Sequence, residues 1–258
     1  MPYQEKCKLV KKEILKDDIF KFTVETENIS KEARPGQFLE IRVADNVEPF
    51  LRRPISIHSI EDNKLVFIFQ IKGKGTEILS AKKEGEEIDI IGPLGYGTFA
   101  VKEYNKVAII GGGIGTFPLY ELAKQLKGKA EVNIYLGFRN KEYVTLEKEF
   151  SEVADKLVIC TDDGSYGEKG YAIDLLKKDF ENEKPDMVFA CGPTPMLRVI
   201  RNYAIENDVK AQLSLEERMG CGLGVCLGCA VKVVENGNET YKHVCKEGPV
   251  FFANQVEI

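Results

Sequence analysis

The first hundred residues alternate short apolar runs with turn residues. Runs rich in Ile, Val and Phe cover 19–24, 38–43, 64–71 and 86–91. Turn-forming pairs and triplets separate them, namely Pro35-Gly36, Asp62-Asn63, Gly73-Lys74-Gly75 and Gly92-Pro93. Many short strands at this spacing are typical of an antiparallel barrel or sandwich. The pattern therefore predicts a β-barrel domain over residues 1–101.

Near residue 102 the pattern changes to strands that alternate with helices. Short apolar strands are expected at 107–110, 132–136, 157–160 and 187–190. Helical spacing of apolar residues covers 118–126, 171–178 and 195–205 between them. Such alternation indicates a parallel sheet with helices on both faces. We assign this α/β domain to residues 102–210.

From residue 211 the chain becomes rich in glycine and cysteine, which suggests a third, small domain over 211–258. Residues 220–228 hold four glycines and two of three closely spaced cysteines, and the third cysteine follows at 229. A short strand at 230–234 leads to a turn at Asn236-Gly237-Asn238. This turn predicts a β-hairpin that returns the chain to Cys245.

The cysteine spacing carries the strongest chemical signal. Four residues separate Cys221 from Cys226, two separate Cys226 from Cys229, and fifteen follow before Cys245. The first three match the plant-type ferredoxin pattern, in which four thiolates hold a [2Fe-2S] cluster. The glycines suit a tight loop that needs positive φ angles and turns backbone N–H groups toward sulfur. Assigning Cys245 as the fourth ligand depends on the predicted hairpin.

A structural zinc site is the alternative for these cysteines, because four thiolates satisfy tetrahedral zinc. Zinc ligands, however, usually come as two short cysteine pairs, whereas Cys245 stands alone here. Of the three other cysteines, Cys7 and Cys160 fall in apolar strands, so we expect them to be small buried side chains.

Composition and charge are those of an ordinary globular protein. The chain has 258 residues, 43% of them hydrophobic and 30% charged, and a formal charge of −5. This acidic balance argues against a nucleic-acid or membrane-surface role. The sequence shows no apolar run that would span a bilayer and no signal-peptide pattern, so a cytoplasmic location is expected. Thiols stay reduced there, which favours metal binding over disulfides.

Two glycine-containing segments end predicted strands of the α/β domain. Gly111-Gly112-Gly113-Ile114-Gly115-Thr116 enters a helix, as phosphate-binding loops do, although a plain strand-to-helix turn would look similar. Cys191-Gly192-Pro193 follows another strand, and ligands of parallel sheets bind at carboxyl ends of strands. Gly137-Phe138-Arg139 offers no acidic partner for a ribose hydroxyl, so NADH and NADPH are not distinguished.

In the barrel half, Arg53-Pro54-Ile55-Ser56 opens a strand. An arginine pairs with phosphate, and a serine hydrogen-bonds to a polar ring edge. Alone, this segment would be a basic pair beside an edge proline, and Gly73-Lys74-Gly75-Thr76 would be a hairpin turn.

Together, the Arg53–Ser56 segment, the glycine loop and Cys191-Gly192-Pro193 resemble the ferredoxin reductase family. The segments 216–222 and 243–251, with their cysteines, look like those of the electron-transfer subunits of NAD-dependent dihydroorotate dehydrogenase type B. The resemblance runs from Pro35-Gly36-Gln37-Phe38 to the C-terminus.

The resemblance implies a cofactor role for each motif. It places FAD on Arg53, Pro54, Ile55 and Ser56, with Ser56 near the isoalloxazine. Ile68, Phe69 and Gln70 would line the ribityl and adenosine side, and Gly75 and Thr76 would meet the pyrophosphate. A nicotinamide nucleotide, NAD, would lie at Gly111, Gly112, Gly113, Gly115, Thr116, Cys191, Gly192 and Pro193. The cluster would be held by Cys221, Cys226, Cys229 and Cys245.

The activity implied is an electron relay. A separate FMN-containing catalytic subunit would oxidise dihydroorotate in pyrimidine biosynthesis, within a heterotetramer of two plus two subunits. Electrons would pass through the cluster to FAD and then to NAD⁺ as a hydride. Two alternatives stay open: a related subunit of a ferredoxin–NADP⁺ or sulfide-linked oxidoreductase, and a zinc-stabilised nucleotide-binding module without redox function.

Overall fold

The computed structural model describes residues 2–44, 48–235 and 237–258. The chain forms two compact units, each assembled from three segments. The first unit comprises Met1–Thr98, Glu216–Ala230 and Lys242–Pro249. The second comprises Phe99–Leu215, Val231–Tyr241 and Val250–Ile258. No helix within the described ranges is both long enough and apolar enough to cross a membrane.

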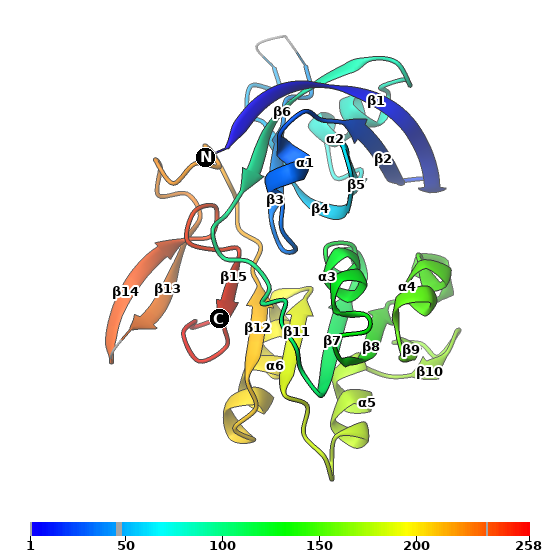
Figure 1. Cartoon of the computed structure of the whole chain (residues 1–258), viewed down its shortest axis with the longest axis vertical. Helices are drawn as coiled ribbons and strands as arrows, with labels where there is room; N and C mark the ends of the chain where they lie inside the picture. Colours follow the sequence, from blue (N-terminus) through cyan, green and yellow to red (C-terminus); the bar gives the residue numbers. More distant parts are fainter. Residues whose placement is uncertain (1, 45–47, 236) are drawn as a thin grey trace. The chain divides into compact units, whose positions relative to one another are not determined.

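The first unit is built on a closed barrel of six antiparallel strands, as predicted (Figure 1). The strand order is β1-β2-β5-β4-β3-β6. Closure leaves no unpaired edge, and alternate residues fill an interior rich in Phe, Ile and Leu. Two short helices, α1 and α2, lie between strands. The bounds are β1 Tyr3–Lys16, β2 Ile19–Glu25, α1 Ile29–Glu32, β3 Phe38–Ile41, β4 Arg53–Glu61, β5 Lys64–Gln70, α2 Lys74–Ser80 and β6 Glu87–Leu94.

Two expected turns have a different structure. Gly92 and Pro93 lie inside β6, where the register between β3 and β6 shifts. A bulge tolerates proline because the interrupted ladder needs no N–H donor there. The segment around Gly73 is not a hairpin turn, since Gly73 directly precedes helix α2.

The second unit contains a seven-stranded sheet in the order β10-β9-β8-β7-β11-β12-β15. All neighbours are parallel except β15, which runs antiparallel to β12 at the edge. The bounds are β7 Lys106–Gly112, η1 Gly113–Thr116, α3 Leu119–Leu126, β8 Glu131–Phe138, η2 Lys141–Tyr143, α4 Glu147–Val153, β9 Lys156–Thr161, β10 Glu168–Lys169, α5 Ala172–Asp179, β11 Met187–Cys191, α6 Thr194–Glu206, β12 Ala211–Ser214 and β15 Val250–Phe252.

The central strands of this sheet are buried on both faces, so their apolar runs are nearly continuous. Helix α3 packs with α4, and α5 packs with α6. Residues of α3 and α4 share one core with alternate residues of β7, β8 and β11. The predicted α/β architecture is therefore confirmed.

The predicted hairpin near the C-terminus is also present. Strands β13 (Ala230–Glu235) and β14 (Asn238–His243) pair in a two-stranded sheet, although Asn236 of the predicted turn lies outside the described residues. Residues 211–258 contribute to both compact units, because β12 and β15 complete the seven-stranded sheet. The three-domain boundaries remain a prediction.

Candidate functional site

The four clustered cysteines lie in two segments of the first unit, Glu216–Ala230 and Lys242–Pro249. Cys229 and Cys245 are buried, with 1% and 2% of their surface exposed, whereas Cys221 and Cys226 are partly exposed. The backbone N–H of Val244 donates to the carbonyl of Cys229 at 3.0 Å. The hairpin thus returns Cys245 to the other three cysteines, as the prediction requires.

Backbone N–H groups of this cysteine loop, residues 216–230, point at sulfur atoms. Leu223 and Cys226 each donate to Cys221 Sγ at 3.4 Å, and Gly224 donates to Cys245 Sγ at 3.1 Å. Gly224 has a φ of +75°, a conformation that glycine adopts without strain. Donors aimed at sulfur stabilise thiolates and the anionic cluster that they hold. The loop therefore fits an iron–sulfur cluster.

The pKa values of two cysteines differ in direction. Burial opposes ionisation of Cys221, yet backbone N–H groups of Cys226 and Leu223 lower the pKa of this thiol to about 6. Burial and the neighbouring Cys229 raise the pKa of Cys245 to about 12. The partly exposed Cys221 therefore favours the thiolate form, whereas the buried Cys245 disfavours an isolated negative charge.

The cysteine side chains do not form a preformed single-ion site. Within the described ranges, no group of three or more His, Cys, Asp or Glu side chains is arranged to hold a metal ion. This absence applies to zinc and to an iron–sulfur cluster alike, so the choice between them rests on the backbone N–H groups aimed at the sulfurs.

The expected flavin segment lies at the start of β4, close to the start of α2. Gly75 leaves room for Arg53, because a Cβ built on Gly75 would stand 2.2 Å from Arg53 Nε. Thr76 Oγ1 accepts from the backbone N–H of Lys72 at 2.8 Å and donates to the Gly73 carbonyl at 3.0 Å. The fold thus brings Arg53, Gly75 and Thr76 together, as a pyrophosphate site requires.

The alternation of side chains along each strand decides which of the other expected flavin-binding residues point away from the barrel core. Pro54 pairs with Glu40 and Ser56 with Phe38, on the face of β3 and β4 that points away from the barrel core. Ile55 packs against that core from the other face.

On β5, the Phe69 ring lies inside the barrel, stacked on Phe20 with centroids 5.7 Å apart. Ile68 and Gln70 alternate with it and so point outward. Only these two of the three expected β5 side chains can face a ligand outside the barrel.

In the second unit, the two glycine segments end neighbouring parallel strands. Gly111, in β7, pairs with Cys191, the last residue of β11. A Cβ on Gly115 would stand 2.6 Å from Gly192 Cα, and one on Gly112 would stand 2.6 Å from Met196 Sδ. The loops therefore touch through their backbones at the carboxyl edge, where the strand order reverses on either side of β7. Such a position is where open parallel sheets bind nucleotides.

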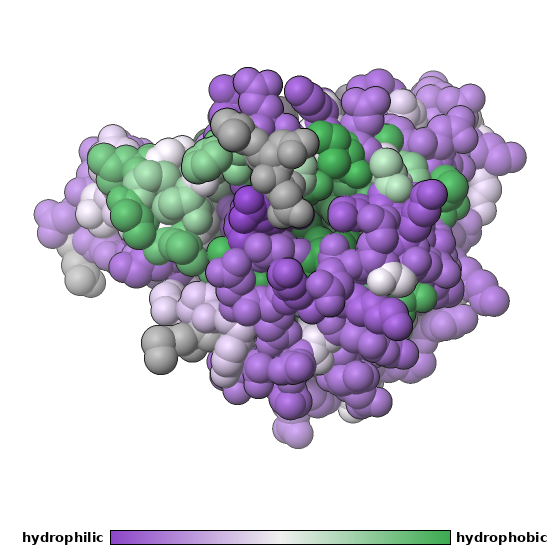
Figure 2. Space-filling model, turned by 90° about the horizontal axis from the view of Figure 1, so that it is seen from above, coloured by the Kyte–Doolittle hydropathy of each residue, from purple (hydrophilic) through white to green (hydrophobic). Residues whose placement is uncertain are grey.

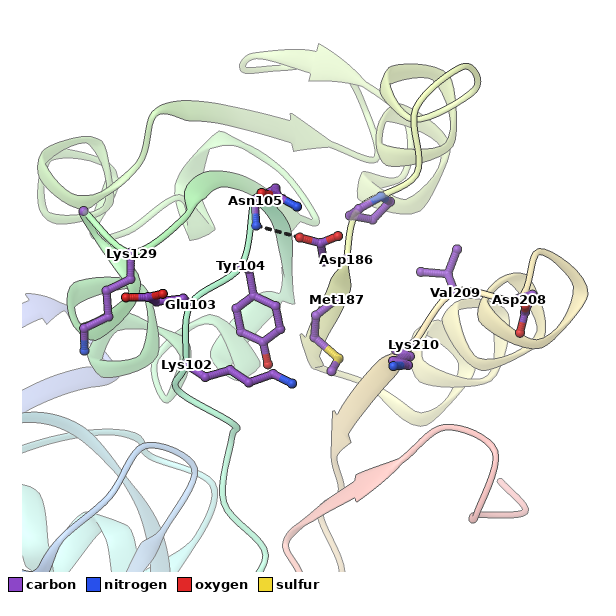
Figure 3. A pocket seen from close by; sticks show the side chains of 12 residues that line it. Lys102, Glu103, Tyr104, Asn105, Lys129, Asp186, Met187, Asp208, Val209 and Lys210 are labelled. Carbon is purple, nitrogen blue, oxygen red and sulfur yellow. Dashed lines mark hydrogen bonds between the residues drawn. The ribbon is translucent and has the colours of Figure 1, made fainter.

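A cavity of about 610 Å³ lies at the opposite, amino-terminal edge of this sheet (Figure 3). Its lining comes from the segments that precede β7, β8, β11 and β12, and includes Lys102, Lys129 and Lys210. None of the residues expected from the sequence to bind a cofactor lines it. The cavity is therefore separate from the glycine segments at the carboxyl edge.

Two family models match the chain. One, described as the iron-sulfur cluster binding domain of dihydroorotate dehydrogenase B, matches residues 216–257. The other, described as the oxidoreductase NAD-binding domain, matches residues 109–202.

Curated relatives match almost end to end. A protein of Desulforamulus reducens is 44% identical over 232 residues, covering 89% of this chain and 88% of the relative. One of Geobacillus sp. strain WCH70 is 40% identical over 99% of both chains. Both are named dihydroorotate dehydrogenase B (NAD(+)), electron transfer subunit. The chain belongs to this family.

Solved structures agree with the fold. A chain from the NADH-dependent reduced ferredoxin-NADP oxidoreductase is 36% identical, has a TM-score of 0.86, and covers 98% of this chain and 90% of its own. The ferredoxin reductase of carbazole 1,9a-dioxygenase is 18% identical, with a TM-score of 0.69 over 81% of this chain and 67% of its own, and shows the fold alone.

The predicted family, fold class and role as an electron-transfer subunit are therefore confirmed. The chain is an electron-transfer subunit of the oxidoreductase complex named for dihydroorotate dehydrogenase B, and the related ferredoxin–NADP⁺ alternative is not favoured. FAD, a [2Fe-2S] cluster and NAD are the cofactors that this assignment and fold support.

Sequence reasoning missed two side chains of these sites. Met196 packs on Gly112 and Gly192 from helix α6, as helical periodicity alone could not show. Glu40 is a buried acid that lies against the cysteine loop. The signal for Glu40 was its place in the otherwise apolar run Phe38-Leu39-Glu40-Ile41.

Proposed function

We propose that this subunit holds FAD on the barrel and a [2Fe-2S] cluster on Cys221, Cys226, Cys229 and Cys245. In this role it passes electrons from an FMN-containing catalytic subunit to NAD⁺. The observation that carries the proposal is the set of backbone N–H groups aimed at Cys221 and Cys245 sulfurs, in the same compact unit as the flavin segment. One unit would thus carry both the one-electron and the flavin chemistry.

The barrel residues would position the flavin. Arg53 supplies a positive charge for the pyrophosphate, and Gly75 lets its guanidinium lie against the backbone. Thr76 holds the turn before α2, while Pro54 and Ser56 offer the outer face of β4, with Ser56 hydrogen-bonding to the ring edge. Ile55 fixes the strand to the core, Ile68 and Gln70 line the remaining side, and Phe69 contributes through its backbone.

FAD, when bound, exchanges a hydride with nicotinamide and single electrons with a cluster. The second unit would present the nucleotide through Gly111, Gly112, Gly113, Gly115 and Thr116, together with Cys191, Gly192 and Pro193. Their close backbone packing leaves main-chain groups free of side chains, so a pyrophosphate can approach them closely.

The catalytic subunit would dock over the cysteine loop. Leu223, Val225 and Leu227 are 44%, 84% and 78% exposed, and they flank the two partly exposed cysteines. Figure 2 shows apolar residues, in green, gathered toward the left of the face that it presents. Exposed apolar side chains beside a redox centre suit a protein partner that must approach closely. We propose a heterotetramer of two plus two subunits.

A cytoplasmic location belongs to the same proposal. All seven cysteines are free thiols in this structure, four of them in the proposed cluster site. A reducing compartment keeps such thiols available for metal binding.

Reconstitution with the catalytic subunit tests the proposal. The chain is purified without oxygen, and iron, acid-labile sulfide and flavin are measured beside the visible spectrum. We expect iron, sulfide and FAD in the subunit and NAD⁺ reduction by dihydroorotate in the reconstituted pair. An iron-free, colourless protein, or a pair that reduces no NAD⁺, would contradict it.

A further inference from the structure

Glu40 lies on the outer face of the flavin barrel. Its neighbours on β3, Leu39 and Ile41, point into the barrel core, so alternation turns Glu40 outward. It stands opposite Pro54 of the flavin segment, one step along the same face from Ser56. The strand therefore places an acid beside the residues proposed to hold FAD.

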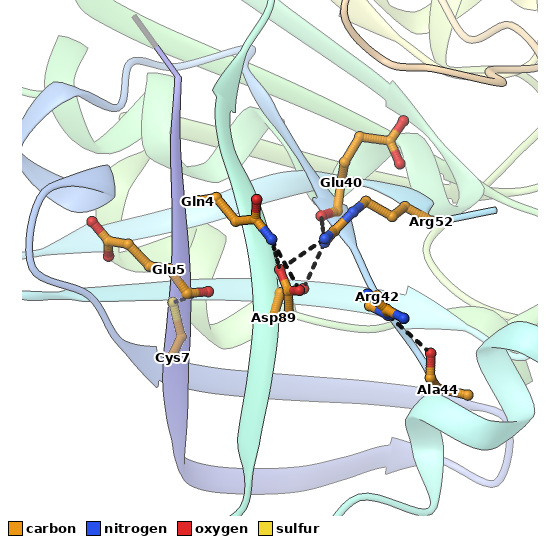
Figure 4. A network of polar contacts seen from close by, with 8 residues as sticks. All are labelled: Gln4, Glu5, Cys7, Glu40, Arg42, Ala44, Arg52 and Asp89. Carbon is orange, nitrogen blue, oxygen red and sulfur yellow. Dashed lines mark hydrogen bonds and ion pairs between the residues drawn. The ribbon is translucent and has the colours of Figure 1, made fainter. Parts of the chain in front are cut away.

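This outward-facing acid is nevertheless buried, with 2% of its surface exposed. Two arginines act on this acid through their charge, but both donate to other groups: Arg52 pairs with Asp89 at 2.9 Å and donates to the Glu40 backbone carbonyl at 3.3 Å, and Arg53 donates to the Leu51 carbonyl at 2.6 Å. Figure 4 shows the Glu40 carboxyl group pointing away from the pair of Arg52 and Asp89. Neither carboxyl oxygen has a hydrogen-bond partner among the residues that the structure describes.

A buried carboxylate without a partner is costly, so burial shifts the protonation equilibrium of Glu40 toward the neutral acid. Burial raises the pKa of Glu40 to about 7; Arg52 and Arg53 oppose the shift, and Cys221 adds to it. A bound anionic cluster would favour the neutral form further.

The carboxyl group lies directly against the cysteine loop. A Cβ built on Gly222 would stand 2.4 Å from Glu40 Oε1 and 2.5 Å from its Cγ. Gly222 also has a φ of +67°, so glycine is required there for both space and conformation. Gly222 follows Cys221 directly, which makes Glu40 the link between flavin strand and cysteine loop.

We propose that Glu40 is a positioning residue for the cluster: as a neutral acid it donates a hydrogen bond into the cysteine loop and raises the cluster's reduction potential. This inference rests on the proposed function, since it requires the cluster. Neither carboxyl oxygen has a partner among the described residues, and the carboxyl group faces Gly222 of the cysteine loop, so the acceptor in this proposal is the group that the loop would hold. Hydrogen bonds to cluster sulfurs favour the more negative, reduced state.

Two substitutions distinguish a hydrogen bond donated by Glu40 from an effect of its charge. Glu40→Gln keeps an N–H donor, and Glu40→Met fills the space with a flexible apolar chain. Glu121→Gln is the matched control, because Glu121 is also 2% exposed but is paired with Lys124 at 2.7 Å in the second unit. The cluster potential is measured by EPR-monitored redox titration of the anaerobic complex with its catalytic subunit.

We expect Glu40→Met to disfavour cluster reduction about tenfold, or 59 mV for one electron, with Glu40→Gln and the control unchanged. An unchanged potential in Glu40→Met, or a raised one in Glu40→Gln, would overturn the inference. If Glu40→Met loses its iron, infrared difference spectra of the wild type and Glu40→Gln provide the test. We expect a protonated-carboxyl band in the wild type that is absent from Glu40→Gln. Absence of this band from both proteins would contradict a neutral Glu40. A wild type without iron would instead refute the proposed function.

Discussion

The guanidinium group of Arg53 lies against the backbone of Gly75, at a distance that no other residue at position 75 would allow. A Cβ there would stand 2.2 Å from Nε and 2.5 Å from Cζ of the arginine. The first residue of β4 and the first turn of α2 are thus joined at one point of the barrel.

Gly75→Ala should weaken flavin binding by pushing Arg53 out of place. Because a guanidinium can move on its flexible stem, we expect the barrel to fold and the Kd for FAD to rise about tenfold, or ~1.4 kcal/mol. Fluorescence titration of deflavinated protein with FAD measures this. Gly73→Ala is the control, because no atom lies within 4 Å of its Cβ position and its φ of 173° is extended. Equal effects of both substitutions would count against the proposed site.

The carboxyl edge of the parallel sheet should tolerate substitution of glycine less well, because two backbone segments meet there. A Cβ on Gly115 would lie 2.6 Å from Gly192 Cα and 2.7 Å from the Cys191 carbonyl oxygen, neither of which can rotate away. We expect Gly115→Ala to destabilise the second unit by about 1–3 kcal/mol and to raise KM for NADH. Urea unfolding and NADH–acceptor kinetics test both effects.

The matched control for that edge is Gly137→Ala in β8. The nearest atom to its Cβ position is 3.4 Å away, so the added methyl group makes ordinary contact. We expect little change in stability or in KM. A KM for NADH that is the same in the wild type and in Gly115→Ala would remove these loops from the nucleotide site.

Cys245 is the proposed cluster ligand that spacing alone could not fix. We expect Cys245→Ser to abolish or strongly reduce iron incorporation, because an alcohol replaces a thiolate in a buried position. Iron analysis and the visible spectrum measure this. Cys160→Ser is the control: Cys160 is equally buried, but its Sγ donates to the Leu136 carbonyl at 3.7 Å in the second unit. Full iron content in Cys245→Ser would require another fourth ligand.

Long apolar strands and helices were predictable because their periodicity is local. Short elements were not. Strand β12 contains buried Gln212 and Ser214, so it looks polar, and Gln212 Oε1 accepts from the Ala100 N–H at 2.8 Å. Strand β15 has three residues and gains its place only by pairing with β12. Such elements depend on partners distant in sequence.

The candidate site shows the same difference between features with a local sequence signal and features that depend on distant parts of the chain. The cysteine loop and the glycine loops carry local signals, since spacing and turn chemistry fix them. Glu40 belongs to no recognisable motif, and the cysteine loop that lies against it comes from a distant part of the chain. Phe69 was expected beside a ligand, yet strand alternation turns its ring into the barrel core.

Apolar residues on the cysteine loop should matter for assembly and not for folding. Val225 and Leu227 are 84% and 78% exposed, so Val225→Asp and Leu227→Asp leave the subunit's own core untouched. We expect each to weaken binding to the catalytic subunit at least tenfold while NADH–acceptor activity is retained. Ile14→Asp, at a residue 65% exposed on β1, is the control. Sedimentation of the mixed subunits measures binding, and wild-type affinity in both loop variants would refute the docking face.

A pH-dependent contribution to stability is expected from Asp179. Tyr135 donates to Asp179 Oδ2 at 2.6 Å, and Lys156 pairs with the same oxygen. Although partial burial opposes it, these hydrogen bonds lower the pKa of Asp179 below its ordinary 3.8. A carboxyl group whose pKa is lower in the folded state than in the unfolded state stabilises the fold at pH values above its unfolded-state pKa. This stabilisation is lost as the pH falls through the folded-state pKa.

We therefore expect Asp179→Asn to destabilise the second unit by about 1 kcal/mol between pH 5 and pH 8, with the difference shrinking below about pH 4. Tyr135→Phe removes the other end of the same hydrogen bond, so the double variant should lose less than the sum of the two single losses. Urea unfolding at pH 7, 5 and 3.5 supplies the comparison. A difference that stays constant down to pH 3.5, together with strict additivity at pH 7, would show that Asp179 acts through packing and that its charge contributes nothing.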